Sequence, residues 1–79
     1  MLVANIALET QPGRARSVAD LMTQVAGVTL HSVDGDHRVL VIWNVPDGQH
    51  PQPEGLSEVF RAMSEEILEV ALLVEEQPS

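Results

Sequence analysis

Hydrophobic residues recur along this chain with two periods, one typical of strands and the other of amphipathic helices. Residues 2–8 and 67–74 alternate between two sets of side chains, so each predicts a strand with one strongly apolar face. The apolar sets are Leu2, Ala4, Ile6 and Leu8 in the first segment and Leu68, Val70, Leu72 and Val74 in the second. The opposite sets are Val3, Asn5 and Ala7, and then Glu69, Ala71, Leu73 and Glu75.

Two other segments place apolar residues three and four positions apart, which predicts amphipathic helices. The stripes are Val18, Leu21, Met22 and Val25 in the first helix and Leu56, Val59, Phe60 and Met63 in the second. Gly27 follows the first stripe directly and is typical of a residue that ends a helix. The segment 47–53 is rich in Pro and Gly, so a loop is expected before the second helix.

A hairpin is predicted at the centre of the chain, where residues 28–33 and 38–45 flank Asp34-Gly35-Asp36. With two central turn residues, the core face would hold Val28, Leu30, Val39, Val41 and Trp43. The other face would hold Thr29, His31, Val33, Arg38, Leu40, Ile42 and Asn44. A turn of three residues would reverse this pairing, so the direction of Trp43 depends on the turn length.

The order of these elements, β-α-β-β-α-β, predicts a ferredoxin-like α+β fold with a four-stranded antiparallel sheet. Both helices are expected on one face of that sheet. We expect a single domain over residues 1–79, with an ordered core at about 2–75 and a frayed tail at 76–79. The uncovered face would hold Val3, Asn5, Ala7, His31, Val33, Leu40, Ile42, Asn44, Glu69, Ala71 and Leu73. An apolar patch rimmed by polar residues favours an interaction surface.

The net charge of −8 comes from twelve carboxylates and four arginines, with no lysine. This field disfavours nucleic acid and anionic membranes and favours cationic partners, although charge that serves only solubility is the simpler interpretation. The N-terminal segment lacks a cationic region, and no apolar run is long enough to span a bilayer, so we expect a cytoplasmic protein without membrane insertion. The absence of cysteine excludes disulfides and thiolate metal sites.

Catalytic chemistry has little support in the sequence. His31, His37 and His50 lack the spacing of a helical metal pair, and the serines lack a nucleophile-elbow motif. His37, close to Asp34 and Asp36, is expected to be an exposed turn residue, with a weak ion site as the alternative. We therefore predict a protein that is not an enzyme and uses no metal or cofactor.

Five stretches of the chain together carry a resemblance to a known family: residues 5–8 (NIAL), 17–25 (SVADLMTQV), 27–28, 39–42 (VLVI) and 65–74 (EEILEVALLV). They resemble the NapD family, the cytoplasmic chaperones of periplasmic nitrate reductase. The resemblance covers roughly residues 3–75, while the proline-rich segment 47–53 and the charge of Glu69 depart from the family pattern. It implies a ferredoxin-like fold that binds the twin-arginine signal peptide of the reductase catalytic subunit on its open sheet face. The peptide would be held back from export while the molybdenum cofactor is inserted.

The side chains of the predicted open face suit such a peptide. Its apolar residues would bury the apolar run, and carboxylates such as Glu69, Glu75 and Asp34 would meet the arginines. Two other functions stay open. An ACT-like regulatory domain would bind a small molecule as a homodimer, and an acylphosphatase-like hydrolase would use Arg14 and Arg16 as an anion cradle. For the chaperone we expect a monomer or a weak dimer.

Overall fold

Six elements follow one another in the predicted order. The structure is a computed structural model that describes residues 2–45 and 53–76. Its elements are β1 (Leu2–Thr10), α1 (Ala15–Met22), β2 (Val28–Asp34), β3 (Arg38–Val45), α2 (Pro53–Met63) and β4 (Ile67–Glu76). The loop predicted at 47–53, with His50, lies outside the described residues, apart from Pro53, which begins α2.

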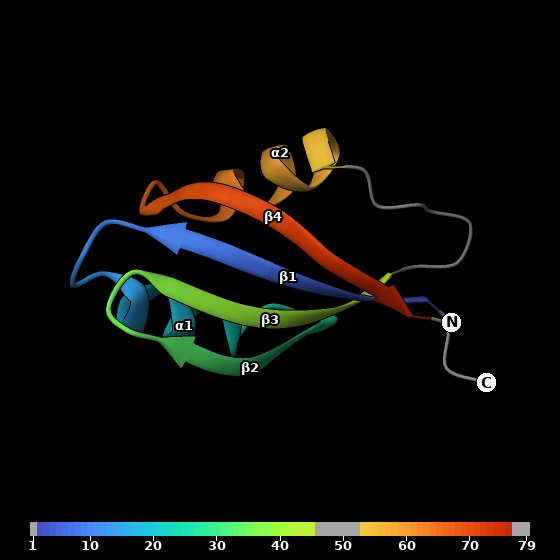
Figure 1. Cartoon of the computed structure of the whole chain (residues 1–79), viewed down its shortest axis with the longest axis horizontal. Coiled ribbons are helices and arrows are strands. Elements are labelled where there is room, and N and C mark those ends of the chain that lie inside the picture. Colours follow the sequence, from blue (N-terminus) through green and yellow to red (C-terminus); the bar gives the residue numbers. More distant parts are fainter. Residues whose placement is uncertain (1, 46–52, 77–79) are drawn as a thin grey trace.

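The four strands form one antiparallel sheet in the order β2-β3-β1-β4. Helix α1 packs against β1, β2 and β3, and α2 packs against β4. Both helices lie behind the sheet in the view of Figure 1, so they share one face. This is the ferredoxin-like fold, and the prediction is confirmed. Within the described part of the chain, no helix is long and apolar enough to cross a membrane.

The core lies between the sheet and the two helices. Its fully buried side chains include Ile6, Leu8, Met22, Val41 and Phe60. Trp43 packs against this cluster, and its ring meets the Phe60 ring edge to face with centroids 6.1 Å apart. Such a contact adds to the burial of both rings. Trp43 therefore faces the core, as the hairpin pattern predicts.

The first helix ends about one turn earlier than its apolar stripe. Helix α1 stops at Met22, and the amides of Gln24 and Val25 then donate to carbonyls three residues earlier. These tighter bonds lead into a turn at Gly27, whose φ of +82° favours glycine. Val25 still packs against the core from this turn.

The hairpin turn has three residues, 35–37, because Asp34 pairs with Arg38. A turn of this length would point every side chain of β2 to the face opposite to the predicted one. A β-bulge between Leu30 and Ser32 returns the residues before it to the predicted face. Val28 and Leu30 therefore face the core as predicted. Val33, between the turn and the bulge, pairs with Val39 and shares its helix-covered face. The prediction of Val33 on the open face is wrong for this reason.

Two further core predictions are wrong. A register shift places Ile67 opposite Thr10 and Glu69 opposite Glu9, which leaves Leu68 between them. Ile67 is buried in the core, whereas Leu68 is 44% exposed. Val59 on α2 is also 44% exposed, because this helix packs mainly on β4 and its buried stripe is narrower than the sequence pattern.

Candidate functional site

The face of the sheet opposite the helices, called the open face below, is the candidate site. Residues paired across neighbouring strands point to the same side of a sheet, so the register defines rows of side chains that cross the face. A charged row contains Asp34, Arg38, Glu9 and Glu69, and the next row contains Ser32, Leu40, Ala7 and Ala71. A third row contains Thr29, Ile42 and Asn5, and Asn44 pairs with Val3 beyond it.

The middle rows of the open face are apolar and accessible. Leu40 and Ile42 are half-buried, and Leu73 is 54% exposed. Ala71 is exposed, whereas its partner Ala7 is only 2% exposed and so forms the floor of the face. No helix among the described residues covers this surface (Figure 1). The strands thus present an apolar surface that residues 2–45 and 53–76 leave uncovered.

A depression of about 250 Å³ lies in this apolar region. It is lined by Asn5, Ile6, His31, Leu40, Val41 and Leu73. The side chains of Ile6 and Val41 are buried in the core, so they form the floor, and the other four form the walls. At about 30 Å³ for each water in the liquid, the depression has the volume of several water molecules and so has room for an aliphatic side chain.

Two β-bulges place the walls of the depression. His31 and Leu73 each lie at a register shift, in the two edge strands β2 and β4. A bulge re-aims the extra side chain and interrupts pairing at a sheet edge. Here both bulged residues line the same depression from opposite edges. The His31 Nδ1 atom lies 3.0 Å from the Ser32 hydroxyl, and this contact restrains the imidazole ring.

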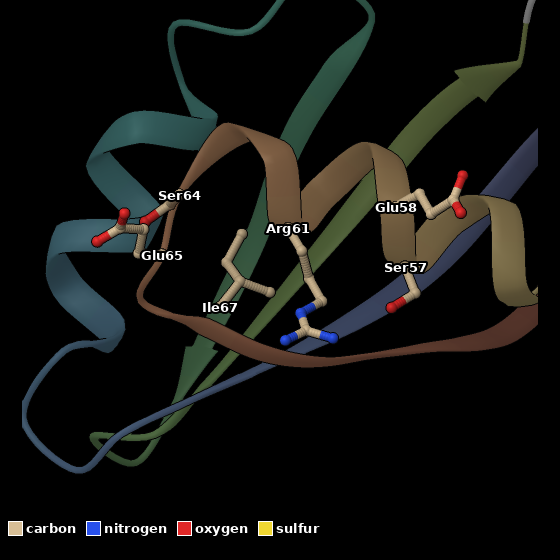
Figure 2. A pocket seen from close by; sticks show the side chains of 6 residues that line it. All are labelled: Ser57, Glu58, Arg61, Ser64, Glu65 and Ile67. Atoms are coloured by element: carbon tan, nitrogen blue, oxygen red, sulfur yellow. The ribbon is translucent and has the colours of Figure 1, made fainter.

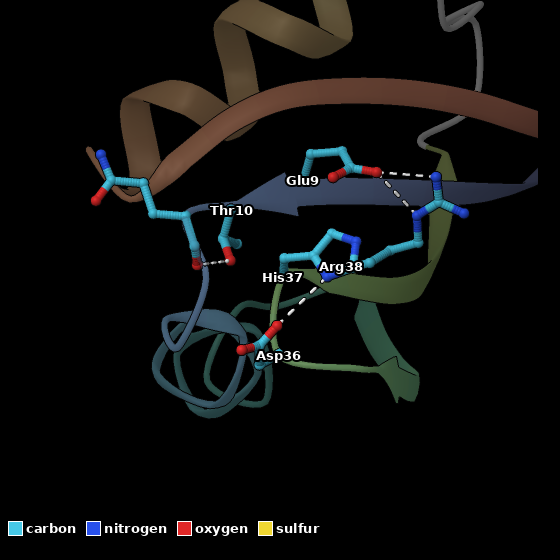
Figure 3. Close-up of polar contacts among 6 residues, drawn as sticks. Glu9, Thr10, Asp36, His37 and Arg38 are labelled. Atoms are coloured by element: carbon cyan, nitrogen blue, oxygen red, sulfur yellow. Dashed lines mark hydrogen bonds and ion pairs between the residues drawn. The ribbon is translucent and has the colours of Figure 1, made fainter.

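The charged row ends the apolar surface on the side of the β2–β3 turn. Arg38 donates from Nε and Nη2 to the same carboxylate oxygen of Glu9, at 3.0 and 2.8 Å (Figure 3). Glu69 lies on the other side of Glu9, and Asp34 on the other side of Arg38. The row therefore carries three carboxylates and one guanidinium. The exposed row is a polar border for the apolar rows beside it.

Ten of the predicted site residues share the open face by register or by lining its depression. They are Val3, Asn5, Ala7, His31, Leu40, Ile42, Asn44, Glu69, Ala71 and Leu73. Val33 is the exception and instead lines a separate depression with Gly13 and Arg16 on the helix-covered side. The Glu75 backbone pairs with Ala4, but its side chain lies outside the described part of the structure.

Sequence reasoning missed the position of Glu9. The alternation of the first strand was read only to Leu8, whereas β1 continues to Thr10. Continuing the alternation from Ala7 by two residues would have placed Glu9 on the open face, and the strand register then sets it beside Arg38. The bulge at His31 did have an indication, because the alternation of β2 breaks at the adjacent polar residues His31 and Ser32. The bulge at Leu73 had none, because residues 72–74 are all apolar and show no alternation.

The loop before α1 does not offer the free donors of an anion cradle. The amides of Gly13 and Ala15 both donate to the Asp36 carbonyl, and the Arg14 amide donates to Gln11. An acylphosphatase-like cradle would need such amides to point at the anion. Two of these amides fasten the loop before α1 to the hairpin turn, and the third closes the loop on itself, which disfavours the hydrolase alternative.

A larger depression, about 440 Å³, lies between α2 and the start of β4. Its lining residues are Ser57, Glu58, Arg61, Ser64, Glu65 and Ile67. Figure 2 shows Arg61 and Ser57 extending from α2 toward β4, while Glu58 points away. Its three charged side chains are exposed and of mixed sign, which is typical of a solvated surface.

Metal-binding geometry is absent from the described residues, where no group of three or more His, Asp or Glu side chains converges. His37 and Asp36 are 3.5 Å apart, and both side chains are more than half exposed (Figure 3). Comparisons with protein-family models, with curated proteins and with solved structures found no match to this chain. The open face is therefore interpreted from its own geometry.

Proposed function

We propose that this domain is a chaperone that binds the twin-arginine signal peptide of a periplasmic nitrate reductase catalytic subunit. In this role it works in the cytoplasm, as a monomer or weak dimer, and holds the peptide back from export during cofactor insertion. The observation that carries the proposal is the open face, which is apolar in its middle rows and charged at one end.

The apolar middle of the open face supports binding of the apolar part of such a peptide. Leu40, Ile42 and Leu73 leave hydrophobic area in water, and the depression beside them accepts aliphatic side chains. Removing apolar surface from water on both partners is the main favourable contribution to association of this kind. A continuous face of a rigid sheet also needs little reorganisation to accept a ligand.

The charge of the chain supports binding of the cationic part. Twelve carboxylates give a net charge of −8, which attracts a peptide with two arginines and speeds their encounter. Exposed opposite charges are screened within about 8 Å at physiological ionic strength, so the affinity should fall as salt is added. If the affinity did not change with salt, the acidic residues would contribute only to solubility.

Isothermal titration with two synthetic peptides tests the proposal. One peptide contains two adjacent arginines followed by an apolar run, and the other has both arginines replaced by alanine. We expect the first to bind and Leu40→Asp to weaken it at least about tenfold, because the new carboxylate must be buried against the apolar run. Val59→Asp is the matched control, since it adds the same charge at an exposed position on α2.

Retention of wild-type affinity in Leu40→Asp, with circular dichroism showing a folded domain, would remove the open face as the binding surface. Equal loss in Leu40→Asp and Val59→Asp would attribute the effect to a general disturbance of the domain, because an added carboxylate alone should strengthen the attraction to a cationic peptide. Size-exclusion chromatography addresses the ACT-like alternative. A stable dimer that ignores both peptides would favour a regulatory domain over a chaperone.

A further inference from the structure

The charged row of the open face is not neutralised within itself. Across the sheet it reads Asp34, Arg38, Glu9, Glu69, so one guanidinium serves three carboxylates. Glu9 and Glu69 are direct cross-strand partners, and like charges in that position repel. The apolar row of Leu40 and Ala7 is next to them. A second cation beside Glu9 and Glu69 would relieve this repulsion and touch the apolar surface at once.

The Arg38–Glu9 pair shows how the row holds a guanidinium. Nε and Nη2 of Arg38 share the Oε1 atom of Glu9, which leaves its other oxygen on the side away from these two bonds. The side chains are 44% and 28% exposed, so an arriving guanidinium has access to the pair. Arg38 thus occupies the carboxylate that a cationic ligand would otherwise use.

We propose that the charged row sets the direction in which a peptide lies on the open face, with Arg38 acting as an internal competitor for its arginine. The guanidinium of the peptide binds beside Glu9 and Glu69, and its apolar run extends toward Ile42 and the depression. Arg38 lowers the affinity of the row for a cation of the ligand, because it already occupies the Glu9 carboxylate. This inference rests on the proposed function, because it assumes that a peptide occupies this face.

The register gives the spacing that such a peptide needs. Glu9 and Asn5 are four residues apart on β1, which is about 13 Å along a strand. The centre of the apolar run should therefore follow the arginines by about four residues if the peptide is extended, or about nine if it is helical. A peptide whose apolar run starts much further away would reach one end of the face only.

Charge-matched variants test the row. Glu69→Gln and Glu58→Gln both raise the net charge by one, but only Glu69 lies on the open face. With the two-arginine peptide we expect Glu69→Gln to bind about two- to fivefold more weakly, and Glu58→Gln to match the wild type. With the alanine peptide, neither variant should differ from the wild type.

A second matched pair tests the competitor. Arg38→Gln and Arg61→Gln both lower the net charge by one, and Arg61 belongs to α2 on the other side of the sheet. We expect Arg38→Gln to bind the two-arginine peptide about two- to fivefold more tightly, while Arg61→Gln leaves the affinity near the wild-type value. The Arg38→Gln gain should shrink when the peptide lacks its arginines.

The outcomes separate this inference from the proposed function. Equal effects within each matched pair would show that net charge alone acts, and would overturn the role of the row while leaving the chaperone proposal in place. Binding that depends on Leu40 but not on Glu69 or Arg38 would do the same. No binding of either peptide to the wild-type domain would overturn both.

Discussion

The two faces of the sheet are formed by the same strands but differ in how far their side chains are buried. On the helix-covered face, Ile6, Val41 and their neighbours are almost completely buried. On the open face, Leu40 and Ile42 are half-buried, and Leu73 is 54% exposed. Consecutive residues of β3 therefore alternate between holding the fold together and facing solvent. Because stability depends mainly on one face, the other is free to carry an apolar surface for a ligand.

The largest test of this difference uses adjacent positions on β3. Val41→Asp places a carboxylate without a partner in the core, where Val41 is 1% exposed, and should cost about 5 kcal/mol of the free energy of unfolding. That is comparable with the whole stability of a small domain, so the variant should be unfolded at room temperature. Leu40→Asp should cost below about 1.5 kcal/mol, because Leu40 is only half-buried and its carboxylate can stay in water. Circular dichroism during urea titration measures both.

A folded Val41→Asp variant would mean that the helices do not seal the core. The helix-covered face would then not be the face that stabilises the fold. An unfolded Leu40→Asp variant would mean that the open face also supports the fold. The first result would show as a cooperative urea transition that Val41→Asp keeps, and the second as a transition that Leu40→Asp has lost. The emission of Trp43 offers a second probe, because its ring packs on Phe60 inside the core.

A smaller effect of the same kind is expected on β4, at Leu72 and Leu73. Leu72 packs against the core, so Leu72→Ala should lower the free energy of unfolding by about 2 kcal/mol. Leu73 is more than half exposed, and Leu73→Ala should cost below about 0.5 kcal/mol. The urea midpoints of the two variants give the comparison.

Leu73→Ala should nevertheless weaken the two-arginine peptide, because Leu73 lines the depression on the open face. Leu72→Ala should leave the affinity of the folded fraction near the wild-type value. The reverse assignment, with stability lost at Leu73 and affinity lost at Leu72, would mean that the bulge in β4 turns the strand the other way. The pair therefore separates contributions to folding from contributions to binding at neighbouring residues.

The sequence was sufficient to predict the order of the elements and, for most residues, whether the side chain faces the core. Alternation in strands and apolar stripes in helices indicate which side of an element is buried. It was insufficient where the backbone departs from regular pairing. Val33 changes face because of the turn length, and Leu68 leaves the core because of a register shift. Both depend on which residues pair across strands, and side-chain alternation along one strand does not encode that. The Leu73 bulge escaped for the same reason, whereas the adjacent polar residues His31 and Ser32 do mark the bulge in β2 as a break in the alternation.

A small effect of opposite sign, a gain in the free energy of unfolding, is expected at Glu69. Glu69→Gln removes a like charge directly opposite Glu9, so we expect the free energy of unfolding to rise by about 0.2–1 kcal/mol at low salt. Added salt should reduce this gain, because both carboxylates are accessible to screening ions. Denaturation at low and high ionic strength measures it, with Glu58→Gln as the control on α2.

A gain in stability from Glu69→Gln, together with weaker binding of the two-arginine peptide, would show that the repulsion in the charged row is relieved by the ligand in the wild-type protein. The helix-covered face offers no parallel, because substitutions in a packed core reduce stability without improving anything else. A loss of stability would mean instead that Glu69 already has a cationic partner in the folded domain. In that case the charged row would stabilise the fold, and only the apolar rows of the open face would be free of that role.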